Sequence, residues 1–327
     1  MSYLFDIIIA VDWSAKSSPS PRTPSADAIW IAVFDIHNNH ISEQYFQTRH
    51  ACKEYLLSIL QKYVESNDKV LLGYDFDFGF PRGLGEALGG SKKETWKFLW
   101  EYLNRVVEDN EQNENNRFEV AAQINKVISH QPGPFWGCPR SKCFESLAYT
   151  SPQYPFLVKD NVLLRKKRWC EHREPRAQPV WKLLGTASVG GQSLLGIPFL
   201  YSLRNHEFLK EHSSIWPFET GFTLPNLPTD GPSIVHVEIW PGILSNHLDK
   251  TIPVRDQAQV RKTVQWLHEW DASGQLAVLM SPPAWVDETM LEDILSEEGW
   301  VIGSGLEGNI FPGNGMENKS ESQGYLF

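Results

Sequence analysis

The sequence has few cysteines and no long apolar run. Its 327 residues include only four cysteines, too few for a disulfide framework in a chain of this length, so we expect reduced thiols. The longest apolar runs, such as 5–11 and 29–34, are far shorter than the roughly 20 residues of a membrane-spanning helix. No basic residue precedes the first apolar run, which argues against a signal peptide. The sequence therefore predicts a cytoplasmic protein without a membrane span.

Positive charge is also scarce. Lys and Arg number 30 against 40 Asp and Glu, which gives a formal net charge of -10. This balance argues against a protein that coats nucleic acid by bulk electrostatics, because such binding neutralises phosphates. Hydrophobic residues make up 41% and aromatic residues 12%, enough to build a core and to exclude global disorder. A folded protein with a local basic patch at most is expected.

Runs of β-branched and apolar residues predict a mixed α/β sheet. A helix expected over 51–64 separates the third predicted strand from the fourth. The first three strands are joined closely enough to be antiparallel, whereas the crossover helix makes later neighbours parallel. This β-β-β-α-β core comprises residues 1–81 plus 233–304. The predicted strands are 6–12, 28–36, 40–47, 69–75 and 233–240.

A large insertion is expected between the two parts of the core. Residues 82–232 have helical patterns separated by a loop rich in proline and tryptophan, with little strand signal. Residues 305–327 show no periodicity and form a predicted tail. A short closing strand is expected at 299–304. Helices are predicted near 92–107, 118–128, 192–212, 255–271 and 287–297.

Three acidic residues lie in or at the end of apolar strands. Asp12 follows Ile-Ile-Ile-Ala-Val, Asp75 follows Val-Leu-Leu-Gly-Tyr, and Glu238 lies within Ile-Val-His-Val-Glu-Ile. A charge near the core of a sheet is costly unless it is paired or binds a metal. Carboxylates are the ligands that Mg²⁺ and Mn²⁺ prefer, so we expect one shared site with carboxyl groups about 4 to 7 Å apart. The simpler alternative is that each residue caps a turn.

The motifs around these acids resemble a known group of proteins. Gly-Tyr-Asp75-Phe-Asp-Phe-Gly-Phe-Pro and Val-Glu238-Ile-Trp-Pro are similar to stretches of an uncharacterised bacterial family predicted to be nucleases of ribonuclease H-like fold. The resemblance covers 6–81 and 233–303. It implies a ribonuclease H-like fold, with Asp12, Asp75 and Glu238 as ligands of Mg²⁺ or Mn²⁺ in a metal-dependent phosphoryl hydrolysis.

Two positions depart from the family pattern. Asp77 stands where the family usually has proline, and the closing acidic helix of the family has no plain counterpart. Candidates for a fourth carboxylate are Asp293, Glu297 and Glu298. We expect Asp293 to complete the catalytic set.

A glycine turn predicts a contact with substrate. Gly185 and Gly190 have the spacing of a phosphate-binding loop, but Gly191 and Gln192 occupy the positions that require Lys and Ser or Thr. A glycine turn that opens a helix still presents N–H groups to an anion, so Gly190, Gly191 and Gln192 are expected to touch substrate. The alternative is a tight turn that packs the helix on the core.

A basic run predicts a second contact with substrate. Arg165, Lys166, Lys167 and Arg168 are followed directly by Trp169, a combination that suits a phosphate backbone and a stacked base. We expect this run on the same face as the strand acids. The alternative is a solvated basic loop.

Three cysteines and a histidine raise the question of zinc. Cys138 and Cys143 are separated by four residues, and Cys170 precedes His172 by two positions. Neither spacing is that of a common zinc finger, so buried thiols are the favoured interpretation and a zinc site the alternative.

The sequence favours a metal-dependent hydrolase of phosphodiester bonds that acts on nucleic acid or another phosphoester. An actin-like or sugar-kinase-like ATPase of related fold needs a glycine-rich hairpin between its first two strands, and residues 14–27 contain no glycine. A non-catalytic binding protein with the insertion as its contact surface is the other alternative.

Overall fold

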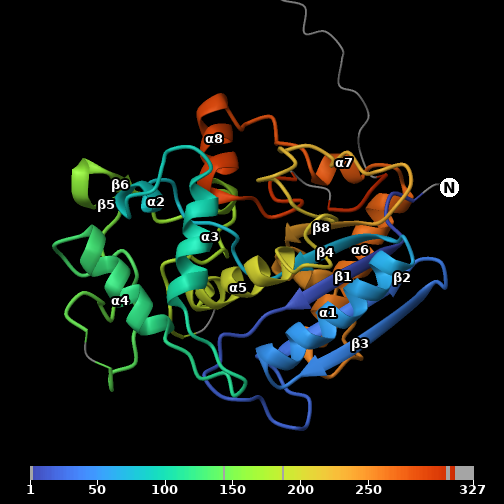
Figure 1. Ribbon diagram of the computed structural model, residues 1–327, viewed down its shortest axis with the longest axis horizontal. Coiled ribbons are helices and arrows are strands. Elements are labelled where there is room, and N and C mark those ends of the chain that lie inside the picture. The colour runs from blue at the N-terminus through green and yellow to red at the C-terminus, as the bar shows by residue number, and fades with distance from the viewer. Residues whose placement is uncertain (1–2, 143, 186–187, 307–309, 314–327) are drawn as a thin grey trace, which may run out of the picture.

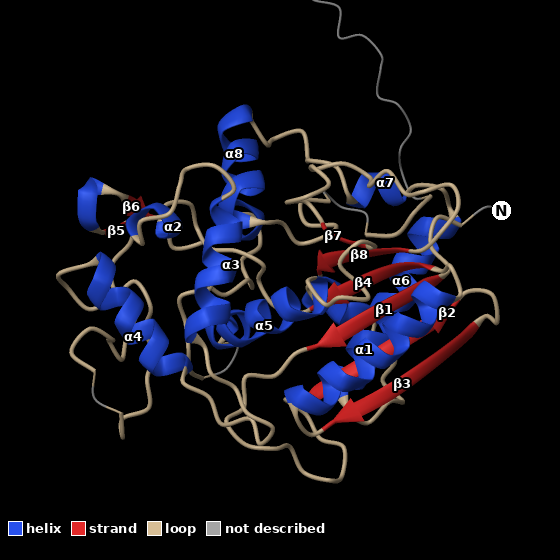
Figure 2. Ribbon diagram, viewed as in Figure 1, coloured by secondary structure: helices blue, strands red, loops and turns tan. Residues whose placement is uncertain are grey.

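A six-stranded mixed sheet forms the centre of the protein (Figures 1 and 2). The computed structural model describes residues 3–142, 144–185, 188–306 and 310–313. The strand order is β3-β2-β1-β4-β8-β7; β1, β2 and β3 pair antiparallel, whereas β1, β4, β8 and β7 are parallel. The predicted mixed α/β sheet is therefore confirmed. The strands are β1 Ile7–Asp12, β2 Ile29–Asp35, β3 His40–Phe46, β4 Lys69–Tyr74, β7 Ser213–Ile215 and β8 Ser233–Glu238.

Helices cover both faces of this sheet and its carboxyl end (Figure 1). A small hairpin of β5, Phe156–Leu157, and β6, Leu163–Leu164, lies apart from the sheet. None of the described helices combines the length and the hydropathy that crossing a membrane requires. The helices are α1 Arg49–Glu65, α2 Leu84–Ala87, α3 Thr95–Val106, α4 Arg117–Ile128, α5 Val189–Arg204, α6 Arg255–Ala272, α7 Leu276–Leu279 and α8 Glu288–Asp293.

The two faces of the sheet are covered by different parts of the chain. Side chains alternate along β1, so Ile9 points to one face and Ile8 to the other. On the first face, α1 packs with α3 and α5 of the segment 82–232, and Leu194 joins the same buried cluster as Ile9. On the second face, α6 packs on β1 and β2, with Val264 in the buried cluster of Ile8. The segment expected as an insertion thus shares a core with the sheet.

Three details differ from the sequence-based expectation. β7 adds a strand within the segment that has little strand signal, because three residues are too few to show a period of two. The expected closing strand at 299–304 is reduced to one bridge between Val301 and Glu238. The expected helix over 192–212 begins earlier and ends at Arg204, where the N–H of Asn205 caps it.

The central strand β8 carries a fully buried histidine. His236 is 0% exposed, and its ring nitrogens lie 3.2 Å from the Tyr74 hydroxyl and 3.3 Å from the Ser213 hydroxyl. Burial, with a smaller effect of Arg204, lowers the pKa of His236 to about 3. The folded protein therefore keeps this ring neutral at pH values where the unfolded chain takes up a proton.

His236 is expected to make the protein sensitive to mild acid. As pH falls from the unfolded value of 6.5 towards 3, the unfolded state alone gains the proton, so the free energy of unfolding falls by about 1.4 kcal/mol per pH unit from this group. We expect His236→Gln to flatten the dependence of urea unfolding on pH between 6.5 and 4. His50→Gln, on an exposed residue of α1, is the control. Parallel pH curves for His236→Gln and the wild type would contradict the assignment.

Candidate functional site

Two of the predicted acids meet at the carboxyl ends of neighbouring parallel strands. Asp12 is the last residue of β1, and Asp75 directly follows β4. Val11 pairs with Tyr74, and the Asp75 N–H donates to the Val11 carbonyl at 2.9 Å. Asp12 and Asp75 are therefore adjacent in register on one face of the sheet. Both line a cavity of about 760 Å³.

The third predicted acid, Glu238, lines the same cavity but is held differently. It pairs with Tyr74 in register, so its side chain leaves the sheet on the opposite face from that of Asp75. Its carboxylate accepts from Arg168 Nη1 at 2.8 Å and Nη2 at 2.6 Å, and from the Phe78 N–H at 2.9 Å. Both oxygens of the Glu238 carboxylate thus accept hydrogen bonds from the protein, and Glu238 holds Arg168 in place.

A further acid on the cavity wall has no sequence signal. Asp256 lies in the first turn of α6, where an acidic residue normally complements the helix dipole. Its carboxylate accepts the Asp27 N–H at 2.7 Å, which fixes the end of the loop between β1 and β2. Burial raises the pKa of Asp256. Only the tertiary fold brings this helix terminus to the strand acids.

The cavity acids repel one another. Burial, then the neighbouring charges of Glu238 and Asp256, raises the pKa of Asp75 to about 7. Burial, then Asp75 and Asp256, raises the pKa of Asp12 well above its usual range. The loss of water and like charges both disfavour the ionised forms. A bound cation would remove both penalties, and a donor set made only of carboxylate oxygens suits Mg²⁺ or Mn²⁺.

A compact metal-ligand geometry occurs among the described residues, but away from the cavity acids. Asp6, His37 and Asp68 present ligand atoms that all lie within 4.8 Å of one another. They sit at the amino ends of β1 and β4, away from Asp12 and Asp75, and His37 Nε2 is 3.2 Å from Asp6 Oδ1. The contacts of His37 Nε2 with the two carboxylates, at 3.2 and 3.7 Å, account for this arrangement without a metal ion. Among the described residues, Asp12 and Asp75 do not form a comparably closed set, either with Glu238, which approaches from the other face, or with Asp256.

Arg168 joins three buried carboxylates below the cavity. The side chain is 0% exposed, and its donors lie 2.8 Å from Asp77, 2.7 Å from Glu171 and 2.6 Å from Glu238. Nη1 also donates to the Glu298 carbonyl at 3.0 Å. Asp77 is therefore a partner of Arg168, and its Oδ2 is buried without a hydrogen-bond partner. Burial raises the pKa of Asp77, and Arg168 opposes that shift.

The rest of the basic run makes internal contacts. Arg165 Nη2 lies 2.8 Å from Asp293 and 2.5 Å from Glu298, and its guanidinium packs 3.7 Å from the centre of the Trp169 ring. Lys167 Nζ donates to the carbonyls of Glu171 and Glu174, while Lys166 is exposed. Of the four basic residues, only Arg168 lines the cavity. The run therefore connects segments of the chain through ion pairs and hydrogen bonds and leaves little of its charge for a substrate.

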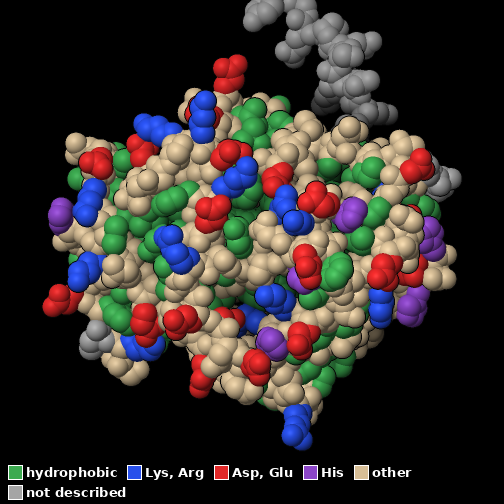
Figure 3. Space-filling view, in the orientation of Figure 1, with side chains coloured by type: hydrophobic (Ala, Val, Ile, Leu, Met, Phe, Trp, Pro, Cys, Tyr) green, Lys and Arg blue, Asp and Glu red, His purple; other side chains and the backbone are tan. Residues whose placement is uncertain are grey.

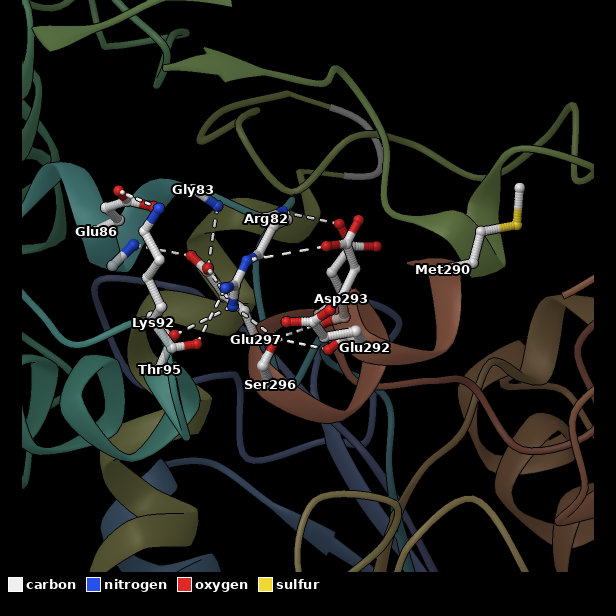
Figure 4. A network of polar contacts seen from close by, with 12 residues as sticks. Arg82, Gly83, Glu86, Lys92, Thr95, Met290, Glu292, Asp293, Ser296 and Glu297 are labelled. Carbon is white, nitrogen blue, oxygen red and sulfur yellow. Dashed lines mark hydrogen bonds and ion pairs between the residues drawn. The ribbon is translucent and has the colours of Figure 1, made fainter. Parts of the chain in front are cut away.

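The expected fourth carboxylate lies in a separate network. Asp293 ends α8 and is not part of the cavity wall. Figure 4 shows Arg82 between Asp293 and Glu297, with the ion pairs at 3.8 and 3.7 Å. Glu297 accepts the N–H groups of Gly83 and Gly85, and Glu298 those of Arg82 and Trp169. These acids join the π-helical turn Ile294–Glu298, which directly follows α8, to two loops. The carboxylate beside Asp12 comes from Asp256 instead.

The glycine turn mainly serves packing. The N–H of Gly190 donates to the Lys182 carbonyl at 2.9 Å, and that of Gly191 to the Ser188 carbonyl at 3.2 Å, so neither is free for an anion. A Cβ at Gly190 would lie 2.0 Å from the Val180 carbonyl oxygen, which only glycine avoids. Gln192 does line the cavity, and its Nε2 donates to the Trp13 carbonyl at 2.6 Å. This bond fixes the chain just after Asp12.

The described thiols show no zinc geometry. Cys143 lies outside the described residues. Cys138 and Cys170 are buried, and they do not form a compact ligand group with His172 among the residues that the structure places. Burial raises the pKa of the Cys170 thiol well above its usual range. The described cysteines thus fit buried, protonated thiols.

The cavity unites Asp12, Asp75, Glu238, Arg168 and Gln192 from the predicted set, and adds Asp256. Known proteins offer no independent guide to its function. Comparisons with protein-family models, with curated proteins and with solved structures find no match.

Proposed function

We propose that the protein is a divalent-cation-dependent hydrolase of phosphoester bonds, with Asp12, Asp75 and Asp256 as the cation-binding residues. The main support is their arrangement: Asp12 and Asp75 at the carboxyl ends of parallel strands and Asp256 in the first turn of α6 line one cavity and repel one another. Ligand sites in α/β sheets lie at these strand ends. Mg²⁺ or Mn²⁺ bound there would supply Lewis acidity and neutralise the charge of a phosphoryl group.

The surrounding residues of the chain have defined tasks in this proposal. Glu238 and Arg168 form a rigid ion pair that supports the cavity from below. Gln192 holds the Trp13 carbonyl and so fixes the backbone next to Asp12. The Asp27 N–H orients Asp256. Asp12 and Asp256 are therefore positioned by a second group, as effective metal sites require of their ligands.

The surface is consistent with a phosphoester that is bound locally. Figure 3 shows basic and acidic side chains interspersed over the face in view, without a broad area of positive charge among the described residues. Extended contact with a nucleic acid backbone depends on such charge. A cavity of about 760 Å³ has the size of a small-molecule site. A small phosphoester or the end of a nucleic acid strand fits these features better than a duplex.

The proposal is tested by hydrolysis after removal of metal with a chelator. Mn²⁺ is added back in the presence of 4-nitrophenyl phosphate, bis(4-nitrophenyl) phosphate or a single-stranded oligonucleotide. We expect Mn²⁺-dependent release of product from at least one of them, lost in Asp12→Asn. Binding of Mn²⁺ without hydrolysis of any of the three would favour the non-catalytic alternative.

A further inference from the structure

The cavity contains a buried cation that has no carboxylate partner. Arg117, the first residue of α4, lines the cavity and is only 6% exposed. Its Nη1 donates to Ser17 Oγ at 2.8 Å and to Asn115 Oδ1 at 2.7 Å. Its Nε is buried without an acceptor, and no described residue accepts from Nη2 or lies within ion-pair distance. A buried charge that lacks an ion pair is costly and needs an explanation.

Arg49, a neighbouring buried arginine, has all of its side-chain nitrogens hydrogen-bonded and provides a comparison. Arg49 is 2% exposed, and its Nε and Nη2 bind the two Asp109 oxygens at 2.5 and 2.6 Å. Its remaining donors reach the carbonyls of Ser14, Lys16 and Asn113. Arg49 is therefore a structural residue that fixes the loop after β1. Burial and then repulsion from Arg49 lower the pKa of Arg117 to about 10, against smaller opposing effects of Asp109 and Glu119, neither of which is within ion-pair distance of it.

Arg117 is held close to the segment that follows β1. Gly191 leaves room for its guanidinium, because a Cβ at that position would lie 3.3 Å from Arg117 Nε and 3.4 Å from the Cβ of Ala15. Ala15 is three residues beyond Asp12. The Phe118 ring, whose centre is 4.4 Å from the guanidinium carbon, supports it from its own helix. Arg117 thus has a fixed position with two donor nitrogens unused.

We propose that Arg117 binds an oxyanion of the substrate, a phosphate oxygen, in a subsite of the same cavity. This inference rests on the proposed function and adds the residue that recognises the phosphate. The Nη2 group is free to donate to a phosphate oxygen, and the charge of the guanidinium strengthens that bond, whereas Nε is buried against Gly191. The missing carboxylate leaves that charge available. The acidic centre at Asp12 and Asp75 repels anions, so a fixed cation on the cavity wall supplies attraction that the centre lacks.

The subsite is tested with inorganic phosphate and metal-free protein. We expect phosphate to bind the wild type and to raise its melting temperature. Arg117→Gln should weaken the affinity in isothermal titration by about 10- to 100-fold, the range for losing hydrogen bonds to a charged group. Arg117→Lys should fall between the two, because it keeps the charge and loses the planar fork. Arg105→Gln, on α3 outside the cavity wall, should bind phosphate as the wild type does.

Unchanged phosphate affinity in Arg117→Gln would overturn the subsite, as would an equal loss in Arg105→Gln. If Arg117→Gln does not fold, a phosphate-soaked crystal of the wild type decides: phosphate within hydrogen-bond distance of Arg117 supports the proposal, and phosphate bound only elsewhere refutes it. A Mn²⁺ titration of the same variants separates the two proposals. If Mn²⁺ still binds but the phosphate affinity is the same in Arg117→Gln and the wild type, the subsite alone is refuted. Failure of Mn²⁺ to bind the wild type refutes the proposed cation site, whatever phosphate does.

Discussion

Asparagine in place of Asp75 is expected to abolish the stabilisation of the protein by Mn²⁺. A cation present at 100 times its dissociation constant stabilises a folded protein by about 2.7 kcal/mol. For a chain of this size that is a rise in melting temperature of about 4 °C. Asparagine keeps the shape of the side chain but loses the charge that the ion requires. Differential scanning calorimetry with and without Mn²⁺ measures the effect.

The same substitution is expected to stabilise the metal-free protein. Burial and the charges of Glu238 and Asp256 raise the pKa of Asp75 to about 7. At pH 8 the ionised carboxylate is therefore disfavoured in the folded state, and its removal gains about 1–3 kcal/mol. Asp230→Asn, in an exposed loop, should change neither quantity. A metal-free Asp75→Asn protein that is less stable than the wild type, or that still responds to Mn²⁺, would contradict the proposed site.

The sheet and two of its acids could be predicted because their signals are local. Four of the five predicted strands are short runs rich in apolar residues, the strand at 40–47 follows the second after a short turn, and the connection lengths fix which neighbours are antiparallel. Asp12 and Asp75 follow the equivalent ends of two such strands, so parallel pairing brings them together. No long-range information is needed for either conclusion.

The positions of the other site residues depend on tertiary structure. The side on which Glu238 leaves the sheet is set by the pairing of β8 with β4, which are separated by residues 75–232, and a shift of one residue reverses it. Asp256 reaches the cavity because α6 crosses β1 and β2. No spacing in the sequence encodes either arrangement.

The basic run illustrates the same limit for charge. Arg165 and Arg168 are close in sequence to other cations, which suggests a positive surface. In the structure each meets carboxylates more than 60 residues distant, such as Asp293 and Glu238. The sequence therefore shows where the basic residues are, but not which carboxylates they pair with in the folded protein. Arg117, isolated among polar residues in the sequence, is a buried cation of the cavity wall without an ion pair among the described residues.

Removal of the Arg168 guanidinium is expected to have the largest effect on stability. Arg168→Met leaves Asp77, Glu171 and Glu238 buried without their shared cation. Breaking a buried ion pair by removing one partner costs about 3–5 kcal/mol. Arg168→Lys should recover only part of this loss, because an ammonium group cannot bind Glu238 through two parallel donors while also reaching Glu171. Urea unfolding at pH 7.5 measures both variants.

Two comparisons show whether that loss comes from unpaired charge. Arg204→Met breaks the partly exposed pair with Glu219 and should cost no more than about 1 kcal/mol. Glu238→Gln introduced into the Arg168→Met protein removes one of the stranded carboxylates, so it should restore stability, whereas in the wild type the same change should destabilise. This reversal of sign is the decisive result, because a mere packing defect at Arg168 would make the second substitution destabilising in both backgrounds.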